Sequence, residues 1–228
     1  MTAPRFPSVA PRGAVRDEKS KTHEERPVLG FDTSGPFCAA ALLLPDRVIQ
    51  RLEPMEKGQA ERLIALLEEV LADGGIGWSD LQTLAVGTGP GNFTGVRISV
   101  AAARGLALGL GIPAVGVTRL EALAYGLPRP VTVIEDARRG EVYVQDFEGD
   151  GDSPGPARLT SADSLTFPPR VTGSAAGPEA LRPAMPLAEA IARIGADRAQ
   201  FPQPRPAPFY LRGADAAPPS DPPPVILP

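Results

Sequence analysis

Histidine and cysteine are almost absent from this chain of 228 residues, which holds one of each. No HxxxH, HExxH or CxxC motif occurs, so a transition-metal site lacks a ligand set and Ser-His-Asp or Cys-His catalysis lacks its parts. His23 lies in a polar N-terminal stretch, and the apolar neighbours of Cys38 favour a small buried strand residue over a catalytic thiol. We therefore expect no metal site and no catalytic residue.

Long hydrophobic runs and an excess of positive charge are also missing. The apolar runs stay well short of the roughly 20 residues that span a bilayer, and the first 26 residues lack the apolar core of a secretory signal. The net charge is −4, whereas a protein that holds RNA by itself is expected to carry a strongly basic face. The sequence predicts a cytoplasmic protein without membrane contact, and any role on RNA would need another subunit to hold it.

Hydrophobic residues make up 43% of the chain, enough for a folded core, and four segments differ in composition. Residues 1–26 are polar, charged and proline-bearing, which predicts a disordered extension. We interpret residues 27–117 as a first lobe and residues 118–200 as a second, smaller lobe. Residues 201–228 hold ten of the 28 prolines, so this tail is expected to be extended, and exposed or wrapped over the surface.

Apolar patterns predict the elements of the first lobe. The segments VLGFDTS, FCAAALLL and RVIQRLE indicate three strands, and leucines at helical spacing indicate an amphipathic helix over 59–72. LQTLAVG is a buried strand, a glycine-rich turn leads into a second helix over 95–110, and IPAVGVT is the next strand. This order, β-β-β-α-β-α-β, matches half of an actin-like or sugar-kinase-like ATPase. The predicted fold class is therefore α/β, an actin-like (ASKHA, ribonuclease H-like) fold of two lobes with the second reduced.

The second lobe has weaker patterns. TRLEALAYG indicates a helix, and the stretch from 131 to 147 indicates a hairpin. A loop rich in Gly, Asp, Pro and Ser follows, then a short strand near RVTG and a helix near PLAEAIARIGA. The cluster DARRGEVY lies at the hairpin turn, and its spacing alone favours an ordinary charged turn.

The segment from Gly87 to Gly95 is the most informative part of the chain. Its four glycines permit positive φ and close approach, and Asn92 or Thr94 can cap the following helix, whose first amides can hold an anion. The loop lacks the lysine of a Walker motif, so a plain tight turn is an equal alternative. Asp32 could face phosphate or metal, or could form an Asx-type turn. The candidate cofactor-binding residues are Asp32, Gly89, Gly91, Asn92, Thr94 and Arg97.

Small residues lie on two faces of the helix over 95–110. One face holds Gly95, Ser99 and Ala103, and the other holds Ala101, Gly105 and Gly109. Packing in the core accounts for one face, and a partner chain is the better explanation of the other. The predicted interface residues, taken from both helices, are Leu63, Leu67, Val70, Ser99, Ala102, Ala103 and Leu106.

VLGFDTS, the helix over 59–72, GTGPGNFTGVRI, GLALGLGIPAVGVTRLEAL and DARRGEVY together resemble the TsaB (YeaZ) family. The resemblance runs from about Val28 to Phe147, with a fainter echo at PAPFYLRGADA. It implies an actin-like fold that has lost catalysis and pairs with TsaD, the related subunit that carries metal, nucleotide and transferase site. TsaD has two metal-binding histidines in its first helix, where this sequence has Gln59, Ala60 and Glu61.

The resemblance also implies a function and partners. The complex transfers threonylcarbamoyl to adenosine 37 of tRNAs that read ANN codons, the small ATPase TsaE docks on the TsaB–TsaD pair, and family members self-associate through the helices matching 59–72 and 95–110. We expect a scaffolding subunit that binds no cofactor alone, with ATP or ADP at or near the interface with TsaD and tRNA bound only through the complex. A small-molecule kinase of the same fold is the alternative, and a metalloprotease has little support from a sequence with a single histidine.

Overall fold

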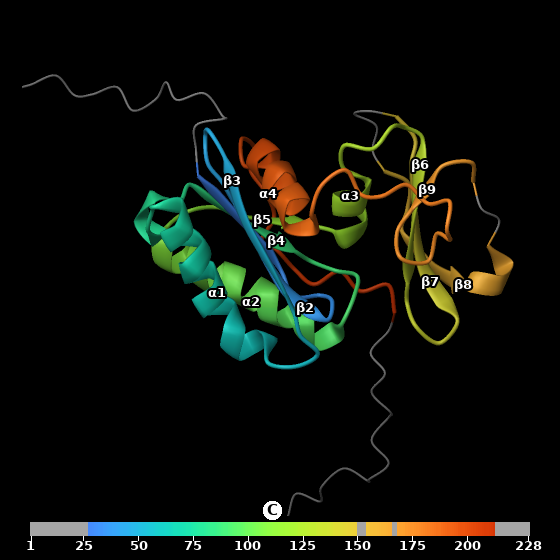
Figure 1. Cartoon of the computed structure of the whole chain (residues 1–228), viewed down its shortest axis with the longest axis horizontal. Coiled ribbons are helices and arrows are strands. Elements are labelled where there is room, and N and C mark those ends of the chain that lie inside the picture. Colours follow the sequence, from blue (N-terminus) through green and yellow to red (C-terminus); the bar gives the residue numbers. More distant parts are fainter. Residues whose placement is uncertain (1–26, 150–153, 166–167, 213–228) are drawn as a thin grey trace, which may run out of the picture.

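The computed structural model describes residues 27–149, 154–165 and 168–212 (Figure 1). The predictions for residues 1–26 and for the end of the proline-rich tail lie outside these residues. The first sheet consists of β1 (Val28–Asp32), β2 (Phe37–Leu43), β3 (Val48–Pro54), β4 (Thr83–Gly87) and β5 (Ala114–Val117). The second consists of β6 (Val131–Asp136), β7 (Glu141–Phe147), β8 (Arg158–Ser161) and β9 (Val171–Thr172). The helices are α1 (Gln59–Gly74), α2 (Phe93–Leu110), α3 (Arg119–Ala124) and α4 (Leu187–Arg198), with short 3-10 turns at Trp78–Asp80 and Ala162–Ser164.

The two sheets share one topology. The first has the strand order β3-β2-β1-β4-β5, in which β1, β2 and β3 run antiparallel and β4 and β5 run parallel to β1. The second has the order β8-β7-β6-β9, with the same directions and one strand fewer. The predicted element order of the first sheet is confirmed. Strand β8 was not predicted, because its sequence RLTS has no apolar alternation.

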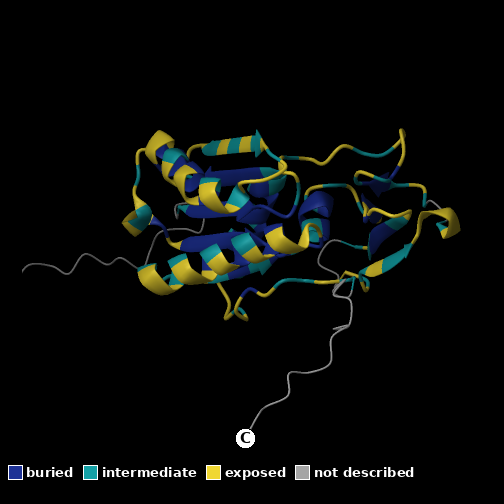
Figure 2. Cartoon of the chain, turned by 90° about the horizontal axis from the view of Figure 1, so that it is seen from below, coloured by how far each residue is buried: buried dark blue, intermediate teal, exposed yellow. Residues whose placement is uncertain are grey.

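Helices α1 and α2 cover one face of the first sheet. The buried leucines and valine of α1 form a single stripe that packs with the apolar face of α2 into the largest core cluster. Asn92 caps α2 by accepting a hydrogen bond from the Gly95 amide at 3.0 Å, and α1 ends where Gly75 adopts a φ of 73°. In Figure 2 the buried strands lie beneath helices whose outward turns are exposed.

The apolar composition of α2 is explained in part by its inner face. It is the one helix in the described part of the chain whose length and mean hydropathy, 1.3 over 18 residues, would suffice to cross a bilayer. Its inner face, which includes Val96, Val100 and Ala103, is buried in the core against α1 and the sheet. Only 33% of this window is buried in the structure, and a single helix of this kind is weak evidence for a membrane span.

Helix α4 covers the opposite face of the first sheet (Figure 1). The prediction that this helix belongs to the second lobe is wrong, because its main contacts are with β1, β2 and β4. The contact is so close that a Cβ atom on Gly30 would lie 2.7 Å from the Ala192 methyl, and one on Gly195 would lie 2.3 Å from the Ala85 methyl. Small residues on both sides therefore bring the backbone of α4 onto the strands, and the chain returns to its first sheet after building the second.

Candidate functional site

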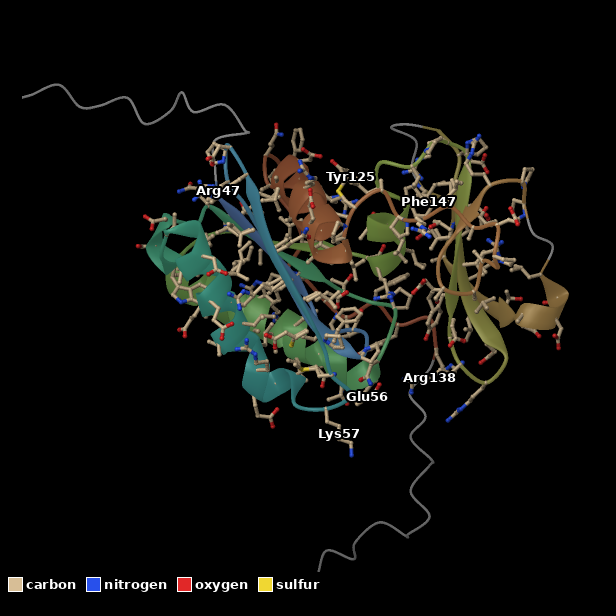
Figure 3. The ribbon with its side chains drawn as sticks, in the orientation of Figure 1. Arg47, Glu56, Lys57, Tyr125, Arg138 and Phe147 are labelled. Atoms are coloured by element: carbon tan, nitrogen blue, oxygen red, sulfur yellow. The ribbon has the colours of Figure 1, made fainter. Side chains whose placement is uncertain are left out.

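A cavity of about 810 Å³ lies between the two sheets. Its walls come from the loop after β1, the start of α2, the start of α3, the end of β6 and the described end of the tail. Glu56 and Arg138, which are labelled in Figure 3, come from the two sides of this cavity. The site therefore combines segments that are far apart in the sequence.

Asp32 forms a turn beneath the cavity. It is fully buried and does not line the cavity; its two carboxylate oxygens accept hydrogen bonds from the Ser34 amide at 2.5 Å and the Ser34 hydroxyl at 2.9 Å. Burial raises the pKa of the Asp32 carboxyl, and the charge of Arg119 and the Ser34 bonds offset part of that rise. The Asx-type turn expected as one interpretation of Asp32 is present.

The glycine-rich loop lines the cavity through Gly91, Asn92 and Thr94, three of the candidate cofactor-binding residues. A Cβ atom on Gly91 would lie 2.5 Å from the Ser34 carbonyl oxygen, so this glycine is needed for the two loops to touch. Gly89 is buried behind the loop and has a φ of 88°. The lining of the cavity thus includes half of the six candidates.

Arg97, the last candidate, lies outside the lining on the exposed side of α2. Its guanidinium lies 3.7 Å from the centroid of the Phe93 ring, and its Nε donates to the Tyr210 hydroxyl at 2.8 Å. Arg97 therefore supports the rim of the cavity by holding two aromatic side chains.

Arg119 and Glu135 connect the two sheets at the floor of the cavity. The Nε of Arg119 donates to Glu135 at 2.7 Å, and the other oxygen of Glu135 accepts from the Ser174 amide at 2.6 Å. Burial acts to lower the pKa of Arg119, but the Glu135 and Asp32 carboxylates outweigh it and the pKa is raised overall. Arg119 is therefore held as a cation. Neither residue was a candidate from the sequence; the only signal was Arg119, a charged residue two positions after the end of β5, at the edge where β1 and β4 also end.

The described part of the tail closes one side of the cavity. Its residues 201–212 form no helix or strand and run over the surface, as predicted for this part. The Phe209 amide donates to the Thr88 carbonyl at 2.8 Å, and the Tyr210 ring stacks on Phe93 with centroids 5.0 Å apart. Arg212 then binds the β6–β7 turn. The tail therefore ties the glycine-rich loop to the second sheet.

The β6–β7 turn lies at the mouth of the cavity. Arg138 and Arg139 have φ values of 63° and 55°, a left-handed conformation that residues other than glycine seldom adopt. Arg138 lines the cavity. The charged hairpin turn favoured from the sequence is confirmed; its two arginines adopt positive φ, and Arg138 lies beside the site.

The predicted interface needs a correction. Leu63, Leu67, Val70, Ser99 and Ala103 are fully or almost fully buried in the core of this chain, and Ala102 and Leu106 are partly buried. A charged side chain at Ala103 would be buried inside this chain and would destabilise its fold. The outward face of α2 instead carries the second small-residue stripe and Leu108, which is 86% exposed.

Comparison with known proteins shows which protein families this chain resembles. A family model described as TsaD, tRNA N6-adenosine threonylcarbamoyltransferase, matches residues 53–218. The chain is 36% identical over 128 residues to the tRNA threonylcarbamoyladenosine biosynthesis protein TsaB of Escherichia coli K12. The aligned region covers 54% of this chain and 55% of that protein. It is 38% identical over 123 residues to TsaB of Bacillus subtilis 168, covering 51% of this chain and 52% of that protein. The chain thus spans about half the length of these curated relatives.

Longer matches cover the second sheet as well. An uncharacterised protein of Mycobacterium tuberculosis H37Rv is 33% identical over 200 residues, 84% of this chain and 94% of that protein. The crystal structure of YeaZ from Pseudomonas aeruginosa superposes with a TM-score of 0.64 at 26% identity, covering 82% of this chain and all of that one. These matches support the actin-like fold class predicted from the sequence.

Proposed function

This chain belongs to the TsaB (YeaZ) family, and we propose that it acts as a non-catalytic subunit in the biosynthesis of threonylcarbamoyladenosine in tRNA. In this proposal it works in the cytoplasm and pairs with a TsaD homologue that holds the nucleotide and transferase site, while a TsaE homologue docks on the pair. The product is threonylcarbamoyl on adenosine 37 of tRNAs that read ANN codons. The chain contacts tRNA only through the complex.

The outward face of α2 is the observation that carries the role as a docking subunit. A side chain on Gly105 or Gly109 would meet no atom within 4 Å, so nothing in the described chain covers these positions. Leu108 is 86% exposed between them, and Ile64 of the neighbouring α1 is 40% exposed. Such a face lets another backbone approach closely around an apolar side chain. The partner in this proposal is the TsaD homologue or a second copy of the chain.

A non-catalytic role is also consistent with the chemistry of the described residues. They contain no group of three or more His, Cys, Asp and Glu side chains arranged to hold a metal ion. Asp32, the residue on which a kinase of this fold would depend, uses both carboxylate oxygens in its turn with Ser34. No specific observation favours the kinase alternative.

Co-expression with the TsaD homologue of the same organism tests the docking role. We expect a stable complex, lost in Leu108→Glu, because the new carboxylate would be buried unpaired at the interface. Leu52→Glu is the matched control: Leu52 is also exposed, at 58%, but it alternates with Arg51, which binds Glu69 and Asp73 of α1, and so faces away from that helix. Co-purification of both variants at wild-type yield would place the interface elsewhere.

Enzymatic assays of the isolated chain test the non-catalytic role. We expect no meaningful hydrolysis of ATP or peptides. Steady-state ATP turnover that Asp32→Ala abolishes would favour the kinase alternative over the proposal.

A gel-shift titration at physiological salt tests the route to tRNA. The net charge of −4 predicts weak binding by the isolated chain, since phosphate contacts need a basic surface. Tight binding without the TsaD homologue would contradict the proposed division of labour.

A further inference from the structure

The tail is attached to the rest of the chain at every third residue between positions 203 and 212. The four attached residues are Gln203, Pro206, Phe209 and Arg212. Most of the residues between them are exposed. A repeat of three is that of a polyproline II helix, in which positions i and i+3 lie on the same side. The tail therefore lies on the surface with one side of such a helix.

The sequence of the tail explains this conformation. Every second residue from 202 to 208 is a proline. Each proline fixes its own φ near −65°, and each residue before a proline is restricted to extended or polyproline II backbone. A segment restricted in this way rises about 3.1 Å per residue and is semi-rigid. The tail is therefore a stiff spacer and not a flexible linker.

The first three attachments lie on the first half of the molecule, meaning the first sheet and the helices α1, α2 and α4 that cover it. The Nε2 of Gln203 donates to the carbonyl of the last residue of α4 at 3.0 Å. Pro206 is buried, and a Cβ atom on Gly116 of β5 would lie 3.6 Å from its Cα. The Phe209 amide donates to the Thr88 carbonyl, directly after β4, at 2.8 Å. This end of the tail is fixed.

The fourth attachment lies on the second sheet and is of another kind. The Nη2 of Arg212 donates to the Ala137 carbonyl at 2.9 Å and pairs with the Glu141 carboxylate, so it holds both sides of the β6–β7 turn. The Glu141 side chain is 38% exposed. An ion pair at the surface can separate without leaving an unpaired charge in the core, whereas a buried proline leaves its site only at the cost of exposing apolar surface.

We propose that the tail is a strap, fixed to the first half and clasped to the second sheet at Arg212, and that this clasp sets how far the cavity between the sheets opens. Residues 209–212 line that cavity, so separation at Arg212 frees the second sheet at its mouth. In Figure 1 the described end of the tail, in red, runs from the first sheet toward the second. The strap does not depend on pairing with a TsaD homologue, because every contact lies within this chain.

Double electron–electron resonance on the full chain tests the proposal by measuring the distance between the two halves. Spin labels are attached through Glu68→Cys on α1 and Asp163→Cys after β8, both at exposed positions, while the native Cys38 is buried. We expect the distance distribution to broaden in Arg212→Met and in Glu141→Ala. The double variant should be no broader than Arg212→Met, because both changes break the same contact.

Hydrogen exchange on the same variants locates the release. Peptides that span the β6–β7 turn should exchange about three-fold faster or more in Arg212→Met than in the wild type. The Phe209 amide should exchange as in the wild type, because the fixed end of the strap stays in place.

Arg158→Met is the matched control. Arg158 also pairs with a carboxylate, that of Asp146, but both residues belong to the second sheet and do not join the halves. Its distance distribution should equal that of the wild type. The proposal is overturned if Arg212→Met and Glu141→Ala leave the distribution unchanged, if Arg158→Met broadens it equally, or if the Phe209 amide is released together with the turn. Because the chain is studied alone, these outcomes are separate from the co-purification result.

Discussion

Two glycines in α2 offer a matched test of how this helix is used. Gly105 lies in the exposed interior of the helix, and a Cβ added there would meet no atom within 4 Å. Alanine is favoured over glycine by about 1 kcal/mol in such a position. For a domain of this size, Gly105→Ala should therefore raise Tm by about 2–4 °C.

Gly95, in the first turn of the same helix, should respond in the opposite direction. A Cβ there would lie 2.0 Å from the backbone oxygen of Thr33, whose hydroxyl donates to the Gly95 carbonyl at 2.6 Å. The obstacle is a backbone atom held in the Asp32 turn, so it cannot rotate away like a side chain. Overpacking of about 3 kcal/mol or more outweighs the helix-propensity gain of about 1 kcal/mol. We expect Gly95→Ala to lower Tm by about 4–8 °C.

Thermal unfolding followed by circular dichroism, with urea titration as a second measure, compares the two variants with the wild type. The comparison is internal, since both changes are glycine to alanine in one helix. A Gly95→Ala variant as stable as Gly105→Ala would refute the assigned contact between α2 and the Asp32 turn. A destabilised Gly105→Ala would show that α2 is covered in the isolated chain.

Three further predictions concern single residues. Burial raises the pKa of Cys38 to about 11, which leaves ~0.1% thiolate at pH 8, so Ellman's reagent should label the urea-unfolded chain and not the folded one; comparable rates would contradict this. Burial raises the pKa of Asp32, so its protonated form contributes to the stability of the fold below about pH 4, and this contribution is lost as the pH rises through the raised pKa. Across that pH range the urea midpoint of Asp32→Asn should rise relative to that of the wild type, and a difference that falls with pH would contradict this. Tyr210→Ala removes the stacking on Phe93 and the bond from Arg97, so limited proteolysis should cut the tail faster while Tm falls by less than about 4 °C; an unchanged cleavage rate would argue against the tail contact.

The first sheet was predictable because each of its elements has a strong local signal. The alternation or continuity of apolar residues in β1 to β5 and the leucine spacing of α1 identify strands and helices without any tertiary information. Helix α4 was also found, but periodicity gives only the apolar face of a helix and not the sheet that it covers. Its contact depends on Gly30 and Gly195, two glycines that a sequence pattern does not pair.

The site was predictable only in part, for a related reason. The glycine-rich loop can be identified from its local sequence. The Arg119–Glu135 pair, in contrast, joins residues 16 positions apart, and the contact of Arg212 with the β6–β7 turn joins residues 75 positions apart. The interface residues predicted from the sequence were wrong because the sequence does not show which side of each helix faces outward. Ser99 and Ala103 belong to a small-residue stripe, but so do Gly105 and Gly109, and only the position of the sheet decides which stripe is covered.

The two small-residue stripes of α2 have different roles. The inner stripe is required by the isolated chain, because Gly95 allows α2 to lie against the Asp32 turn. The outer stripe stabilises nothing in the described residues, and each of its glycines costs the helix about 1 kcal/mol relative to alanine. The outer stripe destabilises the free chain, and packing of another chain against it would explain its presence. At such surfaces, substitutions that stabilise the free chain commonly reduce function. Gly105→Leu should therefore leave the chain folded and at least as stable as the wild type, yet weaken its pairing with the TsaD homologue. Retention of full pairing by this variant would mean that the outer stripe is not the contact.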